Sequence, residues 1–248
     1  MKNTIPILNI FSLLAVIFVN ALANALPING YNTGELSAMY PNLFVPAGFT
    51  FSIWGIIYLV LIVWAIYFLL PNQRKQSRYQ IHGVGKWFIL SCFGNIAWIF
   101  AWHYKYIELS LILMLVILFS LINAYKSLTP GKSNWIEVVP YSVYLGWISV
   151  ATIANTTAFL VHHGVTGGES AAMISSILIM VAFILGLLFI LKKGDIFFGL
   201  IILWAIFGIF KNQVQDPIVQ TTWIAMSGLV LSIIYRIFKG GPYFWSIK

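Results

Sequence analysis

The strongest set of polar residues within the apolar stretches of the sequence is four asparagines, whose side-chain amides need partners there. Asn20 and Asn24 stand one helical turn apart, and Asn95 and Asn155 each lie in a separate stretch. Amides in such places either hydrogen-bond neighbouring helices to one another or line a cavity and bind the polar atoms of a ligand. The residue types therefore indicate recognition by hydrogen bonding, and both alternatives stay open.

Large aromatic rings accompany these amides. Phe51, Trp54 and Tyr58 recur at spacings of three and four residues, which predicts that they share one face of a helix over 48–70. Trp98 and Trp147 also lie deep within apolar stretches. Rings and amides together suit a flat, apolar guest with a few polar atoms, although the same residues would also serve as a packing seam.

The sequence gives no support for chemistry performed by side chains. It holds no Ser/His/Asp set, no glycine-rich phosphate loop and no zinc-protease pattern. Cys92 is the single cysteine, and the adjacent His162 and His163 point in different directions on a helix, so we predict no metal site. No catalytic residue is predicted, and without a recognition motif nucleic acid is excluded as a partner.

The elements that carry these residues are too apolar for a soluble domain. Hydrophobic residues make up 60% of the 248 residues and charged residues 8%, against about a quarter in soluble proteins. Apolar runs of about 20 residues are long enough to cross a bilayer as helices. We therefore predict an all-α, multi-pass membrane helix bundle with the lipid bilayer as its surroundings. Its eight expected spans are 5–26, 48–70, 87–104, 107–126, 136–161, 171–191, 195–211 and 217–237.

The positive charges alternate between the connections of these spans. Twelve Lys and Arg residues fall on the side of the two termini and two on the other side. The positive-inside rule then places both termini in the cytoplasm. Four tryptophans near span ends are expected to lie at the membrane interface, namely Trp87, Trp102, Trp135 and Trp245.

Three segments resemble the TspO/MBR family, the tryptophan-rich sensory proteins that include the translocator protein. PAGFTFSIWGIIY (46–58) is similar to the proline-rich entry and aromatic second helix of the family. FGNIAWIFAWHYKYIELSLILMLVI (93–117) is similar to its third helix, short hinge and fourth helix, and VPYSVYLGWISVATIANTT (139–157) is similar to its fifth. The resemblance covers 1–165, which implies a five-helix core followed by a three-helix transmembrane extension over 166–248.

The resemblance implies that a hydrophobic small molecule binds between the helices. Family members bind tetrapyrroles such as protoporphyrin, and in some cases sterols, so the implied role is that of a sensor or carrier with a bound porphyrin or haem-like tetrapyrrole but no required cofactor. Because the family has bacterial members, a prokaryotic cytoplasmic membrane is the expected location. Positions that match family motifs near the pocket are Trp54, Tyr58, Asn95, Trp98, Trp147, Ala151 and Asn155. Asn20 and Asn24 join this predicted site on polarity alone.

The sequence departs from the family pattern in three ways. Phe49 stands where the second-helix motif usually has tryptophan, and Pro140-Tyr141 lies farther from Trp147 than the family spacing. The charge pattern also places the N-terminus on the side opposite to that described for the family. The side from which a ligand enters therefore stays open.

Several alternatives to a tetrapyrrole receptor stay open. The spans could form a path for a small metabolite, although few ionisable groups lie deep enough to couple such transport to ions. An enzymatic activity, light-dependent porphyrin degradation, is implied by the resemblance alone. The chain could also be a ligand-free structural membrane subunit, and it could form a homo-oligomer.

Overall fold

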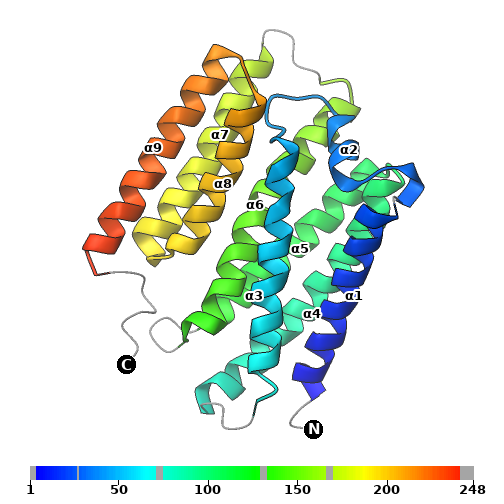
Figure 1. Ribbon diagram of the computed structural model, residues 1–248, viewed down its shortest axis with the longest axis vertical. Helices are drawn as coiled ribbons and strands as arrows, with labels where there is room; N and C mark the ends of the chain where they lie inside the picture. Colours follow the sequence, from blue (N-terminus) through cyan, green and yellow to red (C-terminus); the bar gives the residue numbers. More distant parts are fainter. Residues whose placement is uncertain (1–3, 27, 71–74, 129–132, 166–169, 241–248) are drawn as a thin grey trace. The chain divides into compact units, whose positions relative to one another are not determined.

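The computed structural model describes residues 4–26, 28–70, 75–128, 133–165 and 170–240, and all regular structure in these ranges is helical (Figure 1). The elements in chain order are α1 (Thr4–Ala25), η1 (Ile28–Gly30), α2 (Thr33–Ala38), η2 (Gly48–Ser52), α3 (Ile53–Tyr67), α4 (Lys75–His103), α5 (Ile107–Ser127), α6 (Trp135–His162), α7 (Ser170–Leu188), η3 (Phe189–Lys193), α8 (Ile196–Asn212) and α9 (Asp216–Phe238).

Apolar helices occupy all eight predicted span positions. Seven of the described helices are long and apolar enough to cross a membrane, and α8, with 17 residues, is shorter. Many large apolar side chains point outward, and Phe11, Phe18 and Leu231 are each more than 60% exposed. Such exposure is stable in lipid, where apolar side chains need not be withdrawn from water. The predicted all-α membrane bundle is therefore confirmed.

Contacts divide the chain into two compact units. The first contains the described residues of 1–33 and 53–145, and the second contains those of 34–52 and 146–243. The division falls within α6, whose first half belongs to one unit and whose second half belongs to the other. The predicted division into 1–165 and 166–248 follows the family resemblance and stays a prediction.

Aromatic rings form part of the core of the first unit. Trp64 of α3 forms T-shaped pairs with Phe88 of α4 and Tyr141 of α6, with ring centroids 4.9 and 5.3 Å apart, and each of the three residues is at most 1% exposed. Edge-to-face pairs of this kind contribute about 0.5–1.5 kcal/mol beyond the area they bury. They join three helices at one level of the unit.

Short turns set the directions of the helices. Between α4 and α5, Lys105 adopts a left-handed φ of 61°, and the Tyr106 amide donates to the Ala101 carbonyl at 2.8 Å. This confirms the short hinge that the resemblance implies. Gly194, with φ 67°, ends η3, and the Asp195 carboxylate then caps α8 by accepting from the amides of Phe197 and Phe198.

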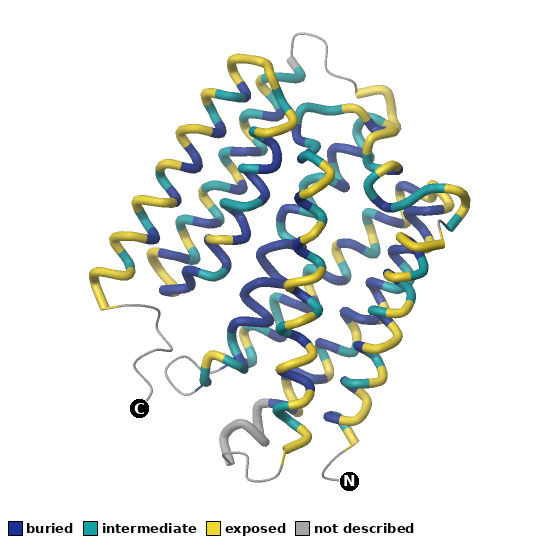
Figure 2. Tube along the Cα trace, in the orientation of Figure 1, coloured by how far each residue is buried: buried dark blue, intermediate teal, exposed yellow. Residues whose placement is uncertain are grey.

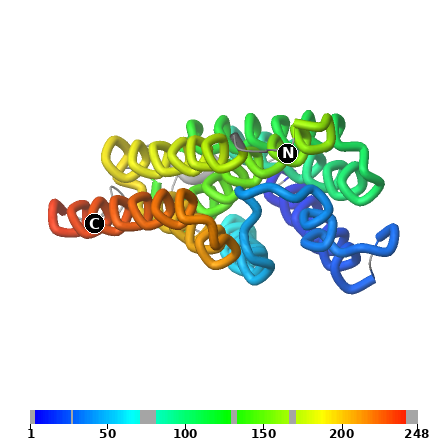
Figure 3. The backbone as a smooth tube through the Cα atoms, turned by 90° about the horizontal axis from the view of Figure 1, so that it is seen from above, coloured from blue at the N-terminus to red at the C-terminus, as the bar shows by residue number. Residues whose placement is uncertain are grey.

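The second unit contains α7, α8 and α9 in mutual contact (Figure 1). Figure 2 shows buried and exposed positions alternating turn by turn along α7 and α9, as expected for helices with one protein-facing side, and Figure 3 shows these two helices running side by side. Small residues permit the close approach. At Gly186 of α7, for example, a Cβ atom would lie 2.7 Å from the Leu229 side chain of α9.

The proline-rich entry segment, residues 41–52, packs against α8 within the same unit. The Ala47 amide donates to the Gly208 carbonyl at 2.9 Å, and the Trp204 indole N–H donates to the Thr50 carbonyl at 3.0 Å. Asn212 and Gln213 both donate to the Val45 carbonyl, at 3.0 and 3.4 Å. Groups of α8 and of the adjoining Gln213 therefore satisfy backbone hydrogen-bonding groups of the entry segment, which makes few hydrogen bonds of its own.

Two expectations about local structure are wrong. The predicted helix over 48–70 begins as the 3₁₀ helix η2, so Phe51 belongs to a different element from Trp54 and Tyr58. The predicted span 87–104 is matched by an apolar span over Ile81–His103, although the helix that contains it begins earlier, at Lys75. Trp102 is 5% exposed and packs inside the first unit, whereas Trp135 is 57% exposed, as an interface residue should be. Trp245 lies outside the described residues.

Gly208 offers a test of the contact between the entry segment and α8. A Cβ atom there would collide with the fully buried Thr50 side chain, whereas a Cβ atom at Gly55 of α3 would meet nothing within 4 Å. We expect Gly208→Ala to lower the free energy of unfolding by about 1–3 kcal/mol through overpacking. Gly55→Ala should leave it unchanged or raise it by up to about 1 kcal/mol, the helix propensity gain. If Gly208→Ala and Gly55→Ala had the same free energy of unfolding in a denaturant titration, the close contact between Gly208 and Thr50 would be contradicted.

Candidate ligand-binding site

Three aromatic rings of the first unit meet between α3 and α6. Trp54 and Tyr58, one turn apart on α3, stack with centroids 5.5 Å apart and an interplanar angle of 23°. Tyr144 on α6 forms a T-shaped pair with Trp54, with ring centroids 5.9 Å apart. Trp54 and Tyr58 are half-buried, whereas Tyr144 is 2% exposed. The stacked pair therefore forms the accessible side of the cluster and Tyr144 forms its interior.

A chain of hydrogen bonds connects this cluster to α4 and α1. The Asn20 amide donates to the Asn95 carbonyl oxygen at 2.8 Å and to the Val16 backbone carbonyl at 2.9 Å. Asn95 in turn donates its amide to the Tyr144 hydroxyl at 3.3 Å, and its side chain is fully buried. In hydrocarbon these bonds have no competition from water. The amide and aromatic residues predicted from separate spans are thus joined across three helices.

Among the polar atoms of this unit that are buried without hydrogen-bond partners, two belong to predicted site residues. They are the Tyr58 hydroxyl and the Trp98 indole nitrogen. Trp98 stacks on Trp102 with centroids 5.8 Å apart, and the Trp102 nitrogen donates to the Thr33 carbonyl at 3.4 Å. A buried donor without an acceptor costs about 1–3 kcal/mol, and such atoms are uncommon in folded proteins. A bound ligand that carries hydrogen-bond acceptors could satisfy the Tyr58 hydroxyl and the Trp98 N–H.

The predicted site residues are divided between the two units. Six lie in the first unit, namely Asn20, Asn24, Trp54, Tyr58, Asn95 and Trp98. The other three are Trp147, Ala151 and Asn155, which follow one another along the half of α6 that belongs to the second unit. There Trp147 is 3% exposed and forms a T-shaped pair with Phe51, with ring centroids 6.0 Å apart, and Asn155 is likewise 3% exposed. The share of these three residues in a site stays a prediction.

Sequence reasoning included one residue with little connection to the network and missed one at its centre. Asn24 is exposed, and its amide donates to the Asn20 carbonyl one turn back on the same helix. Tyr144, by contrast, joins Asn95 to Trp54. It lies three residues before Trp147 and seven before Ala151, so helical spacing could have placed it on the predicted face.

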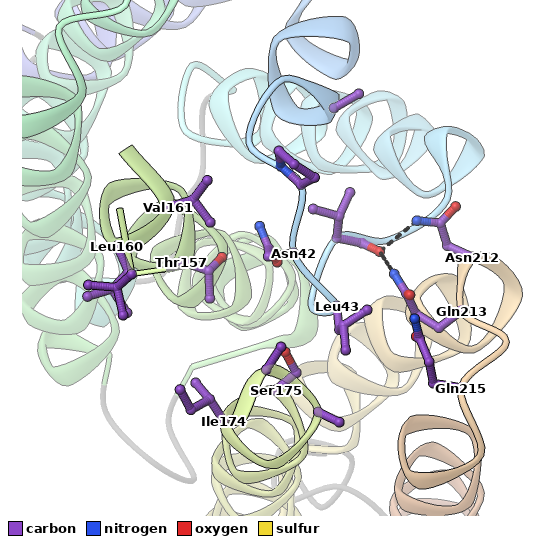
Figure 4. Close-up of a pocket in the computed structure, with 16 residues that line it drawn as sticks. Asn42, Leu43, Thr157, Leu160, Val161, Ile174, Ser175, Asn212, Gln213 and Gln215 are labelled. Atoms are coloured by element: carbon purple, nitrogen blue, oxygen red, sulfur yellow. Dashed lines mark hydrogen bonds between the residues drawn. The ribbon is translucent and has the colours of Figure 1, made fainter. Parts of the chain in front are cut away.

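The second unit contains a cavity of about 810 Å³ (Figure 4). It lies among the end of α6, the start of α7, the residues between α2 and η2, and the connection between α8 and α9. None of the predicted site residues lines it. Its lining is mostly apolar, with six polar side chains, which are Asn42, Thr157, Ser175, Asn212, Gln213 and Gln215.

A second hollow of about 580 Å³ lies along α8 and α9 and is almost entirely apolar. Its walls include Trp204, Phe207, Phe210 and Trp223. The Lys211 ammonium lies 5.6 Å from the Phe207 ring centroid and 5.7 Å from that of Phe210. These cation–π contacts hold the Lys211 side chain against aromatic rings of α8.

These features define an all-helical, multi-pass membrane protein with rings and amides in its interior. The chain belongs to the TSPO-like protein family, which it matches over residues 6–236. The match reaches beyond 1–165, where the three motifs lie, and includes the last three apolar helices. No curated protein and no solved structure gives a significant match.

The hydrogen bond between Asn20 and Asn95 can be measured with a double-mutant cycle. We expect Asn20→Leu and Asn95→Leu to destabilise the protein separately and to show a coupling energy of about 0.6–1.7 kcal/mol, as for interhelical bonds in membranes. The measurement is the free energy of unfolding of both single variants and the double variant.

Asn123 supplies the control for this cycle, because its amide donates at 2.8 Å to the Phe119 carbonyl of its own helix. Pairing Asn123→Leu with Asn20→Leu should give no coupling. If the Asn20–Asn95 pair gave none either, the bond would contribute nothing to the stability of the bundle.

Proposed function

We propose that this protein binds a flat, apolar molecule against the rings and amides of its first unit and acts as a membrane sensor or carrier. The leading candidate for the ligand is a tetrapyrrole such as protoporphyrin, as the family resemblance implies. The observation that carries the proposal is the connected network from Asn20 through Asn95 and Tyr144 to Trp54 and Tyr58.

The chemistry of the network suits such a ligand. Ligand sites are mostly apolar and contain a few polar groups that fix orientation. Indole and phenol rings can stack on the apolar faces of a tetrapyrrole, while the Trp98 N–H and the Tyr58 hydroxyl remain available for its polar atoms. No ionisable side chain is needed for this mode of binding.

The exposure of the cluster suggests a route for entry. Trp54 and Tyr58 are half-buried, whereas Asn95 and Trp98 are at most 7% exposed. A ligand would therefore contact the stacked pair first, and deeper binding would require these two rings to move apart from Tyr144. Rotation of aromatic side chains is a smaller rearrangement than separation of whole helices.

We further propose that both termini face the cytoplasm. The support is the distribution of Lys and Arg, twelve on one side of the membrane and two on the other. On this orientation Lys192 and Lys193, both exposed after α7, lie inside, and Val214 between α8 and α9 lies outside.

Protoporphyrin titration tests the proposed site. We expect Trp54→Ala to weaken binding about tenfold, because the loss of a stacking ring and its buried area amounts to about 1.4 kcal/mol or more. Binding is followed by the shift of the Soret band in nanodiscs, with empty nanodiscs subtracted. Trp223→Ala, which removes a 55% exposed ring of α9, is the control and should bind as wild type does.

Two outcomes would refute the tetrapyrrole proposal. One is the same affinity for wild type, Trp54→Ala and Tyr58→Ala. The other is no band shift beyond that of empty nanodiscs. Trp98→Phe refines the test, because it keeps a ring and removes only the N–H, and it should weaken binding less than Trp54→Ala does.

Cysteine labelling tests the orientation. Cys92 is the only cysteine and is buried, so an introduced cysteine should be the reactive one. In sealed right-side-out vesicles we expect an impermeant maleimide to label Val214→Cys and to leave Lys193→Cys unlabelled until the membrane is opened. The reverse pattern would place the termini outside.

A further inference from the structure

The cavity of the second unit is separate from the proposed tetrapyrrole site. Its lining comes from four stretches of the chain, represented in Figure 4 by Asn42, Thr157, Ser175 and Gln213. All of them lie within one unit, so its shape does not depend on the placement of the other. With about 810 Å³ it falls within the usual range of roughly 300–1,000 Å³ for small-molecule sites.

Some polar groups of this lining are already engaged within the protein. Asn42 donates to the Tyr40 carbonyl at 2.8 Å and accepts from the Phe44 amide at 3.0 Å, which fixes the local turn. Asn212 and Gln213 donate to the Val45 carbonyl, and each keeps its own amide oxygen as a further acceptor. These bonds hold the wall of the cavity in place.

Two other polar residues of the lining are Ser175 and Gln215. Ser175 is only 5% exposed. Gln215 precedes α9, yet its side chain does not cap that helix. A buried hydroxyl and an uncommitted amide at one cavity supply both donors and acceptors to a guest.

Charge is absent from the described lining of the cavity. No acidic, basic or histidine side chain is among its residues, and the nearby Lys211 lies against the Phe207 and Phe210 rings. A charged group placed against this lining would find no counter-charge among the described residues. The site therefore favours a neutral guest, and its apolar walls at Leu43, Leu160 and Ile174 favour one with a hydrocarbon part.

We propose that this cavity binds an uncharged amphiphile whose polar end carries hydroxyl or amide groups. The polar end meets Ser175 and Gln215, and the hydrocarbon part lies against Leu43 and Leu160. This site and its ligand class are independent of tetrapyrrole binding, so either proposal can fail without the other.

A reporter cysteine tests the proposal. In a Cys92→Ala background, Leu160→Cys places a thiol in the wall of the cavity without removing a polar group, and its rate of maleimide labelling is measured in nanodiscs. We expect octyl glucoside, below its micellar concentration, to slow labelling about fivefold. Octyltrimethylammonium and octyl sulfate, with the same alkyl chain and a charged end, should have little effect. Val214→Cys, 88% exposed and outside the cavity, should be labelled at the same rate throughout.

Variants of the polar groups make the test specific. Ser175→Ala and Gln215→Leu should each raise the octyl glucoside concentration needed for protection about three- to tenfold, whereas Gln220→Leu, an exposed position of α9 outside the lining, should not. Equal protection by neutral and charged amphiphiles would overturn the proposal, and so would a lack of protection by all three. If Leu160→Cys does not fold, Val161→Cys serves as the reporter, with the same outcomes.

Discussion

Water cannot satisfy hydrogen bonds in the hydrocarbon of a bilayer, and this constraint explains where polar side chains lie within each unit. Backbone groups are satisfied within helices. Side-chain amides must find partners in the protein, and Asn20 and Asn95 find them in each other and in Tyr144. The same need explains why many intramembrane hydroxyls, such as Ser120, donate to a carbonyl of their own helix. Polar side chains without such a partner are then the ones that call for a functional explanation.

The entry segment is where the constraint is hardest to meet. Residues 41–52 include two prolines and leave carbonyls that no helix of their own can satisfy. The donors come from Trp204 and Asn212 of α8 and from Gln213, which follows this helix. Phe49 stands where the family resemblance leads one to expect tryptophan, and the Trp204 indole forms a T-shaped pair with it, with ring centroids 5.5 Å apart. A helix of the C-terminal part thus provides an indole beside the position that lacks one.

Hydropathy was enough to predict where the helices lie, because the burial of apolar runs in lipid depends little on tertiary detail. It did not predict the start of α4 at Lys75, which lies among polar residues, or the 3₁₀ geometry of η2. In the candidate site, the side-chain amides could be recognised in the sequence because amides are rare in apolar runs. Tyr144 could not be recognised in this way, because tyrosine is common in membrane helices. Its role depends on its tertiary partners Asn95 and Trp54. The cavity could not be predicted at all, since its lining comes from four stretches distant in sequence.

The length of α8 has a consequence for the surrounding lipid. Its 17 residues rise about 25 Å, less than the roughly 30 Å of hydrocarbon in a typical bilayer. Helices shorter than the membrane are accommodated by local thinning of the bilayer or by flanking residues that reach its surface. Here the entry segment lies along the last turns of α8 through Ala47 and Val45. The hydrophobic thickness of the bilayer should therefore act first on the contact between the entry segment and α8. Lipids with long acyl chains should strain this contact, and lipids with shorter chains should relieve the strain.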